Sequence, residues 1–213
     1  MRPEDVRRAY DAVAEDYAAY FPDTAAEAPD DLSMVDAFVE AVGTAGDAAV
    51  LDAGCGTGRM SRLLADRGCH VEGMDLSPGM VQQAWQHHPD LRFTVGSLTK
   101  LPYPDGHFAG VLLWYSIIHT PPAGLRHVFA ETARVLRPSG DVLVGFQAGT
   151  GVRDVSAAYR RFGHDVKLER YRYTDGDVVA LLEAVELRET CRLIRRPRGP
   201  ETDDQAFVLA ARP

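Results

Sequence analysis

The sequence predicts an α/β fold, with a mostly parallel sheet that carries helices on both faces. Between about residues 48 and 146, short apolar runs typical of buried strands alternate with segments of helical spacing. One apolar run leads straight into three glycines at alternate positions, Gly54, Gly56 and Gly58, which predicts a tight turn. Near the C-terminus two strand-like runs follow one another without a helix between them, so they can pair antiparallel.

The individual elements follow from local patterns: helical spacing marks helices, uninterrupted apolar runs mark strands, and Pro and Gly mark boundaries. Ser77-Pro78 is a favourable N-cap and first helical position, and Gly68 is a favourable helix stop. Pro138-Ser139-Gly140 is expected to end a helix and turn the chain. The expected helices span 5–21, 32–42, 59–67, 78–87, 125–136 and 175–184. The expected strands span 48–51, 70–74, 91–95, 108–114, 141–146, 187–194 and 206–211.

The composition predicts one domain of ordinary globular character. The 213 residues are 46% hydrophobic and 25% charged, which is enough for one substantial core. The net charge of −8 argues against nucleic acid or an anionic membrane surface as a partner. No apolar run reaches the ~18 residues of a membrane span, and the first residues lack the apolar core of a secretory signal. We therefore expect a soluble cytoplasmic protein.

The three cysteines, Cys55, Cys69 and Cys191, are odd in number and widely spaced. This spacing predicts neither a disulfide framework nor a metal site. Cys55 lies inside the glycine turn, where it is expected to be a small residue that fits rather than a reactive thiol.

The glycine turn joins a strand to a helix, an arrangement that places a nucleotide-like ligand at a helix N-terminus. The dinucleotide motif G-x-G-x-x-G would need its third glycine at position 59, where this chain has Arg59. Gly58 instead comes one residue early, and Asp52 stands just before the turn. Asp75 ends the next strand ~20 residues after Gly54, the usual offset of a ribose-binding carboxylate.

The stretch Val50-Leu51-Asp52-Ala53-Gly54-Cys55-Gly56-Thr57-Gly58 resembles the first motif of the class I S-adenosylmethionine (SAM)-dependent methyltransferases. The resemblance covers nearly the whole chain. Tyr10-Asp11-x-x-Ala14-x-x-Tyr17 is similar to the lid-helix start of the family's ubiquinone/menaquinone-type members (methyltransferase type 11), and 133–140 resembles the stretch before their fifth strand. The resemblance implies a Rossmann-like, seven-stranded sheet with an antiparallel last strand, an N-terminal helical lid and SAM as cofactor.

The resemblance also implies a set of cofactor contacts. Asp75 would accept hydrogen bonds from both ribose hydroxyls, while Leu76 and Met80 would lie against the adenine, although as bare residues they are more typical of a core. Trp114 and Tyr115 would bracket the methionine part, because aromatic faces attract a sulfonium cation. The implied contacts are Tyr10, Tyr17, Asp52, Gly54, Cys55, Gly56, Gly58, Asp75, Leu76, Met80, Ser97, Leu98, Trp114 and Tyr115. For the two helical tyrosines, simple helix packing is an equal alternative.

Two positions depart from the family pattern. Gly96-Ser97 stands where the family often has Gly-Asp, and Phe108-Ala109 stands where it usually has Phe-Asp. A serine hydroxyl is a shorter, neutral acceptor, whereas the backbone of Leu98 still suits the adenine edge. The SAM hypothesis stands, with fewer carboxylates at the adenine end.

His119 follows the fourth strand, at the edge where open α/β sheets bind ligands. It matches the first histidine of the family's Leu-His-His and is the expected catalytic residue, a modest base for a hydroxyl or amine acceptor. The alternative is a structural histidine that backbone groups satisfy.

We expect a single domain over 1–213, with lid helices in 1–45 and a substrate-side insertion in 147–173. The expected function is methyl transfer from SAM to a small-molecule acceptor at O, N or C, by a monomer or homodimer. A SAM-binding regulatory protein and an NAD(P)-dependent oxidoreductase are the alternatives. The mix of arginines and aromatic residues in 147–173 suits an aromatic or anionic acceptor, with arginines pairing a carboxylate or phosphate, although Arg160 and Arg161 are better explained as a solvated helix face.

Overall fold

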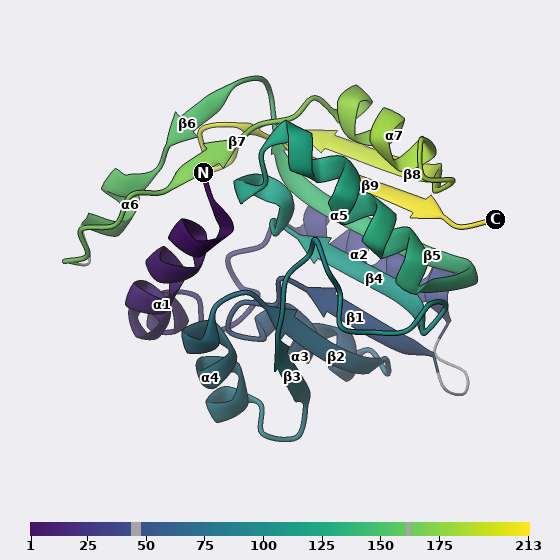
Figure 1. The fold of residues 1–213 in the computed structure, drawn as a ribbon, viewed down its shortest axis with the longest axis horizontal. Helices are drawn as coiled ribbons and strands as arrows, with labels where there is room; N and C mark the ends of the chain where they lie inside the picture. Colours follow the sequence, from purple (N-terminus) through teal and green to yellow (C-terminus); the bar gives the residue numbers. More distant parts are fainter. Residues whose placement is uncertain (44–47, 161–162) are drawn as a thin grey trace.

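A single large sheet organises the computed structural model, which describes residues 1–43, 48–160 and 163–213 (Figure 1). Its strands are β1 (Ala49–Ala53), β2 (His70–Asp75), β3 (Arg92–Val95), β4 (Phe108–Trp114), β5 (Leu136–Ala148), β8 (Arg188–Arg195) and β9 (Asp204–Ala211). The spatial order of these seven strands is β3-β2-β1-β4-β5-β9-β8. Only β9 runs against its neighbours, pairing antiparallel with both β5 and β8. The expected seven-stranded sheet with an antiparallel last strand is confirmed.

Helices cover both faces of this sheet (Figure 1). They are α1 (Pro3–Tyr20), α2 (Pro29–Val42), α3 (Arg59–Asp66), α4 (Pro78–His87), α5 (Pro122–Val135), α6 (Ser156–Arg160) and α7 (Asp175–Glu183), with a 3-10 turn η1 (Ile117–His119). Buried side chains of α2 and α3 form one apolar cluster with the sheet, and those of α5 and α7 form another. None of these described helices has the length and apolar character needed to cross a bilayer.

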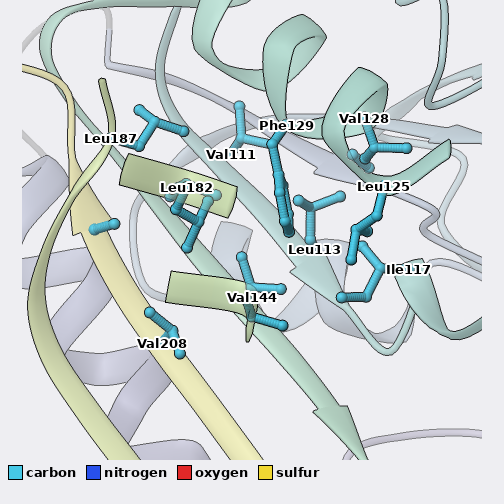
Figure 2. Packing of buried hydrophobic residues seen from close by; sticks show 14 of the residues in the cluster. Val111, Leu113, Ile117, Leu125, Val128, Phe129, Val144, Leu182, Leu187 and Val208 are labelled. Atoms are coloured by element: carbon cyan, nitrogen blue, oxygen red, sulfur yellow. The ribbon is translucent and has the colours of Figure 1, made fainter. Parts of the chain in front are cut away.

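Strand β4 shows why the central strands read as uninterrupted apolar runs. All of its residues are buried, and from Val111 to Trp114 they alternate between the two apolar clusters. Val111 and Leu113 face the cluster with Phe129 of α5, as Figure 2 shows, whereas Leu112 and Trp114 belong to the opposite cluster. A strand with helices on both faces needs no polar positions, so its pattern is continuous rather than alternating.

Most element boundaries agree with the sequence prediction. The strand at 108–114 and the helix at 78–87 have the expected limits. The Ser77 hydroxyl accepts a hydrogen bond from the Met80 backbone N–H and Pro78 follows as the first helical residue, as the capping rules predict. Helix α2 begins at Pro29, three residues earlier than expected, because this proline is also compatible with a first helical turn.

The stretch Pro138-Ser139-Gly140 corrects one prediction. It does not separate α5 from a strand that starts at 141, because β5 already begins at Leu136, paired with Phe108. The register then shifts, Ser139 adopts φ +60°, and pairing resumes between Asp141 and Gly110. The expected turn is therefore an irregularity inside a long strand, imposed by cross-strand contacts that no local pattern encodes.

The segment after β5 forms a small layer of its own. β6 (Val152–Asp154) and β7 (Glu169–Tyr171) pair antiparallel as a two-stranded sheet beside α6, close to α1 in Figure 1. These elements, which the sequence analysis treated as one substrate-side insertion, were not predicted individually. Within that insertion Arg161 and Phe162 lie outside the described residues, as do residues 44–45 of the expected lid segment.

A buried ion pair links α2 to the end of β8. Both carboxylate oxygens of Asp31 accept from the Arg195 guanidinium, at 2.5 and 2.6 Å. The same guanidinium also donates to Glu201, at 2.6 and 2.8 Å. Asp31 is only 1% exposed, so its charge depends on this bidentate partner.

Replacing Asp31 by Ala should lower the free energy of unfolding by about 3 kcal/mol, because it leaves part of the Arg195 charge buried and unpaired. The adjacent variant Asp30→Ala is the matched control. It removes an exposed pair with Arg198 and should cost less than ~1 kcal/mol. Urea denaturation measures both values. Equal decreases in the free energy of unfolding would show that the buried pair stabilises the fold no more than the exposed pair.

Candidate functional site

A cavity of about 1370 Å³ lies at the carboxyl ends of the central strands, between them, α1 and the small β6–β7 layer. This is the edge at which open α/β sheets bind ligands. Ligand pockets usually measure ~300–1,000 Å³, so this one has room for more than a single small molecule. The predicted residues that line it are Tyr10, Tyr17, Gly54, Gly56, Asp75, Leu76, Met80, Ser97, Leu98, Trp114, Tyr115 and His119.

The glycine turn after β1 forms one wall and needs its glycines. Gly54 has φ +86°, and a Cβ there would lie 2.2 Å from the Cβ of Ser116, so the turn touches the end of β4. Gly56 has φ +54°, and its surroundings are open on the side where a Cβ would stand. Gly58 lines no part of the cavity; it is the left-handed N-cap of α3 and packs against Phe93.

The Asp75 carboxylate accepts hydrogen bonds from the backbone of two separate segments. Its Oδ2 accepts from the Gly56 N–H at 2.9 Å, and its Oδ1 accepts from the Ser77 N–H at 2.8 Å. Burial raises the pKa of this carboxyl despite those hydrogen bonds. The carboxylate thus fixes the glycine turn and the start of α4, and each oxygen retains a lone pair for a ligand.

Asp52 lies next to the glycine turn, and only one of its two carboxylate oxygens accepts a hydrogen bond in the described structure. Its Oδ2 accepts from the Ser61 hydroxyl at 2.6 Å, while its Oδ1 is buried and has no partner among the described residues. Burial raises its pKa to about 6. The residue lines a small pocket together with Arg59, Trp114 and the glycine turn. A buried acceptor without a partner is costly, which makes this oxygen a candidate for a ligand's donor.

Two further buried polar atoms near the glycine turn also have no partner in the described structure. They are the indole Nε1 of Trp114 and the hydroxyl of Ser116, at the carboxyl end of β4. Arg59 adds a largely buried guanidinium, which is paired with Glu27 and lines both the small pocket and the large cavity. Arg59 was not among the predicted site residues; its position at the start of α3, directly after the glycine turn, is the sequence signal for a place at the site.

The aromatic pair at the end of β4 is held rigidly. Tyr115 has a positive φ of +53°, which is costly for a side chain of this size. Its hydroxyl donates to Gln205 Oε1 at 2.8 Å, and Trp114 stacks on Phe207 with ring centroids 4.9 Å apart. Both rings line the cavity.

Helix α1 is docked on the N-terminus of α4. Asp11 Oδ1 accepts from the Ser77 hydroxyl at 2.6 Å and from the Gly79 N–H at 3.0 Å. A Cβ at Gly79 would lie 3.3 Å from the Cβ of Ala14, so the two helices approach closely there. This contact turns Tyr10 and Tyr17 toward the cavity, with their rings edge-to-face at 6.3 Å.

His119 has both ring nitrogens engaged. Nδ1 lies 2.7 Å from the carbonyl oxygen of Glu169, which can only accept, so Nδ1 carries the proton. Nε2 therefore accepts from the Tyr10 hydroxyl, at 2.8 Å. Burial lowers the pKa of this imidazole to about 4, and the ring is neutral at pH 7.

The remaining predicted residues divide between cavity and core. Cys55 packs against Val81, Ala84 and Phe93, and burial raises the pKa of its thiol well above the usual range, as expected for a small fitting residue. Met80 is 1% exposed, contacts the core under α1 and also lines the cavity. Ser97 and Leu98 lie in the turn after β3, where the Ser97 and Thr99 hydroxyls are 2.9 Å apart.

Comparison with known families gives one match over this part of the chain. Residues 50–140, from β1 into β5, match the family model described as a methyltransferase domain. A demethylmenaquinone methyltransferase of Beutenbergia cavernae is 39% identical over 110 residues, covering 51% of this chain and 44% of that protein. A malonyl-[acyl-carrier protein] O-methyltransferase of Serratia marcescens is 32% identical over 146 residues, covering 68% and 52%. The chain spans about half the length of these relatives.

Solved structures share the fold. The 1,6-didemethyltoxoflavin-N1-methyltransferase of Burkholderia thailandensis, solved with its substrate and S-adenosylhomocysteine, superposes with a TM-score of 0.75 at 20% identity, covering 100% of this chain and 91% of that one. A SAM-dependent methyltransferase of Methanosarcina mazei gives 0.69 at 16% identity, covering 84% and 96%. Both have the fold that the strand order shows here. Residues 50–140 thus match a methyltransferase domain, and the chain as a whole has the fold of these solved methyltransferases.

Proposed function

We propose that this protein transfers a methyl group from SAM to a small-molecule acceptor at an O, N or C atom. The observation that carries the proposal is the group of buried polar atoms without partners on Asp52, Trp114 and Ser116. They surround the glycine turn at the strand ends, where the family places its cofactor. Such atoms are destabilising unless a ligand completes their hydrogen bonds.

The unpartnered atoms fit the amino-acid end of SAM. Asp52 Oδ1 suits an ammonium group, whose positive charge would also lower the raised pKa of that carboxyl. The Trp114 N–H, the Ser116 hydroxyl and the Arg59 guanidinium are donors suited to a carboxylate. The residues present therefore match a zwitterion, with acceptor and donors on the same wall.

We assign the ribose and adenine of SAM to the part of the cavity wall that contains Asp75. Its two oxygens lie side by side at the cavity wall, which suits the vicinal hydroxyls of a ribose. Leu76 and Met80 offer an apolar surface for the adenine, and Ser97 and Leu98 offer polar groups at its edge. Leu76 follows β2 directly, and Ser97 is the second residue after β3, so adjacent strand ends position both groups.

When bound, SAM supplies an activated methyl group on a sulfonium, so the protein contributes mainly alignment and exclusion of water. The Trp114 and Tyr115 rings are fixed beside that position and attract positive charge through their faces. Tyr10 and Tyr17 of α1 cover the cavity and limit access of water.

His119 is the proposed base. Its Nε2 lone pair faces the cavity side of the ring, and the position now filled by the Tyr10 hydroxyl, 2.8 Å away, is where an acceptor O–H or N–H would bind. The Nδ1–H bond to Glu169 fixes the ring and its tautomer. Because the ring is neutral at pH 7, the lone pair is ready to take a proton.

We further infer that the protein works as a monomer or homodimer in the cytoplasm, with a small-molecule acceptor and no nucleic acid. The net charge of −8 supports this, because nucleic-acid binding is dominated by positive charge facing the phosphates. Lid helices in 1–45 and a substrate-side insertion in 147–173 complete the proposed single domain.

The direct test incubates the full chain with labelled SAM and a panel of small hydroxyl, amine and carboxylic-acid compounds, and measures release of S-adenosylhomocysteine. We expect SAM to bind in calorimetry and at least one acceptor to be methylated. Binding of SAM with no product from any acceptor would favour a regulatory SAM-binding protein instead.

Replacing Asp75 by Ala should weaken SAM binding by ~1.5–3 kcal/mol, because the variant removes a charged acceptor for two hydroxyls. Calorimetry measures the affinity, and circular dichroism confirms the fold. Asp90→Ala is the control, since that carboxylate is exposed and pairs with Arg62 away from the cavity. Unchanged SAM affinity in Asp75→Ala would refute the ribose contact.

Replacing His119 by Ala should lower turnover and leave SAM affinity nearly intact, because the ring serves the acceptor rather than the cofactor. Tyr10→Phe removes the hydroxyl that now occupies Nε2 but retains the ring, and we expect it to keep most of the SAM affinity. Calorimetry and initial rates separate the two effects. Loss of SAM binding in His119→Ala would refute the assignment as a base.

The pH dependence of kcat gives an independent check. Burial places the His119 pKa near 4, below the ordinary ~6.5, so the ring stays unprotonated as the pH falls through 6.5. We therefore expect kcat at saturating SAM to hold from pH 8 to about pH 5 and to fall only near pH 4. An acidic limb centred near 6.5 that disappears in His119→Ala would contradict the buried, neutral state.

A further inference from the structure

We propose that the methyl acceptor carries an anionic group, a carboxylate or a phosphate, which binds to Arg153 and Arg170 in the cavity wall. The inference rests on the proposed methyl transfer and adds the chemical class of the acceptor. Both arginines line the cavity, on the side formed by the small β6–β7 layer and the loop before β9. Neither belongs to the wall assigned above to SAM.

The two guanidinium groups are brought together by strand pairing. Arg153 on β6 and Arg170 on β7 are direct cross-strand partners in the antiparallel register. Like charges at such positions destabilise a strand pair unless a negative group offsets them. The arrangement therefore requires a counter-charge in the space that the two side chains share.

Asp203 is the protein's own counter-charge, and it is insufficient. This buried carboxylate contacts Arg153 at 3.0 Å, Arg170 at 3.6 Å and also Arg172 at 3.2 Å. Arg172 does not line the cavity. Three positive groups thus share one negative group, which leaves an excess of two positive charges, and the two arginines that face the cavity are where a ligand anion can offset it.

Three other carboxylates close to this cluster contact groups other than these arginines. Asp154 accepts from the backbone N–H and the hydroxyl of Ser156, and Glu201 binds Arg195. Glu169 lies 3.9 Å from the N-terminal amine of Met1. The Nε atom of Arg170 is buried and has no hydrogen-bond partner in the described structure, so this side chain has an unused donor.

The arginine cluster is connected to the proposed reaction centre. Arg170 directly follows Glu169, whose carbonyl oxygen holds Nδ1 of His119. Its positive charge also helps to lower the pKa of His119, which places it within electrostatic reach of the imidazole. On the opposite side, Gln205 accepts from the Tyr115 hydroxyl and donates to the Asp203 carbonyl oxygen. An anion held at Arg153 and Arg170 would therefore place the rest of a small acceptor near His119.

The test uses the full chain and an acceptor panel made of matched pairs, each a carboxylic acid or phosphate ester and its neutral amide or alcohol. We expect methylation to be at least about ten-fold more efficient, in kcat/KM, for the charged member of every productive pair. Arg153→Gln and Arg170→Gln should each raise KM for that acceptor roughly 10- to 100-fold and leave SAM affinity unchanged. Arg196→Gln is the matched control, because it removes an equal charge from a side chain that is 90% exposed and outside the cavity.

A direct titration separates this inference from the proposed function. Calorimetry with inorganic pyrophosphate should show binding to the wild-type protein and to Arg196→Gln, and loss of binding in the Arg153→Gln/Arg170→Gln double variant. Equal kcat/KM for charged and neutral acceptors, or absence of pyrophosphate binding, would overturn the anionic acceptor. Absence of SAM binding and of any methylated product would instead overturn the methyl transfer itself.

Discussion

The candidate site depends on one carboxylate. Asp75 holds the backbone N–H of Gly56 with one oxygen and that of Ser77 with the other, so it joins the turn after β1 to the start of α4. Ser77 in turn donates to Asp11, which docks α1 over the cavity. Three segments that are distant in sequence are thus fixed through two consecutive side-chain contacts.

This chain of contacts joins the cofactor wall to the proposed acceptor side. Helix α1 carries Tyr10 to the Nε2 atom of His119, and the Nδ1 atom of the same ring binds the β7 backbone at Glu169. The histidine therefore links α1, the end of β4 and the small β6–β7 layer. A neutral imidazole suits this position, because it donates at one nitrogen and accepts at the other without placing a charge in a buried site.

Much of the fold was predictable because its signals are local. The continuous apolar run of β4 and the Ser77-Pro78 start of α4 specify their elements without help from distant residues, and both have the expected limits. The long β5 strand was not predictable in the same way. Its first residues, from Leu136, extend only because they pair with Phe108, and a tertiary contact overrides the Pro-Ser-Gly signal there. The three residues of β6 or β7 are likewise too few for a pattern.

The sequence by itself predicted the class of cofactor, through its resemblance to a known motif, and the edge of the sheet at which we propose that it binds, because the glycine turn, Asp52 and Asp75 lie within a short stretch whose spacing is set by one strand, one turn and one helix. Only the tertiary structure singled out two arginines of the 147–173 segment for the proposed acceptor side. Arg153, Arg170 and Asp203 are separated by up to 50 residues and meet through the β6–β7 pairing and the loop before β9. Electrostatic complementarity between side chains acts through space, so the positive excess that they create is invisible until the strands bring them together.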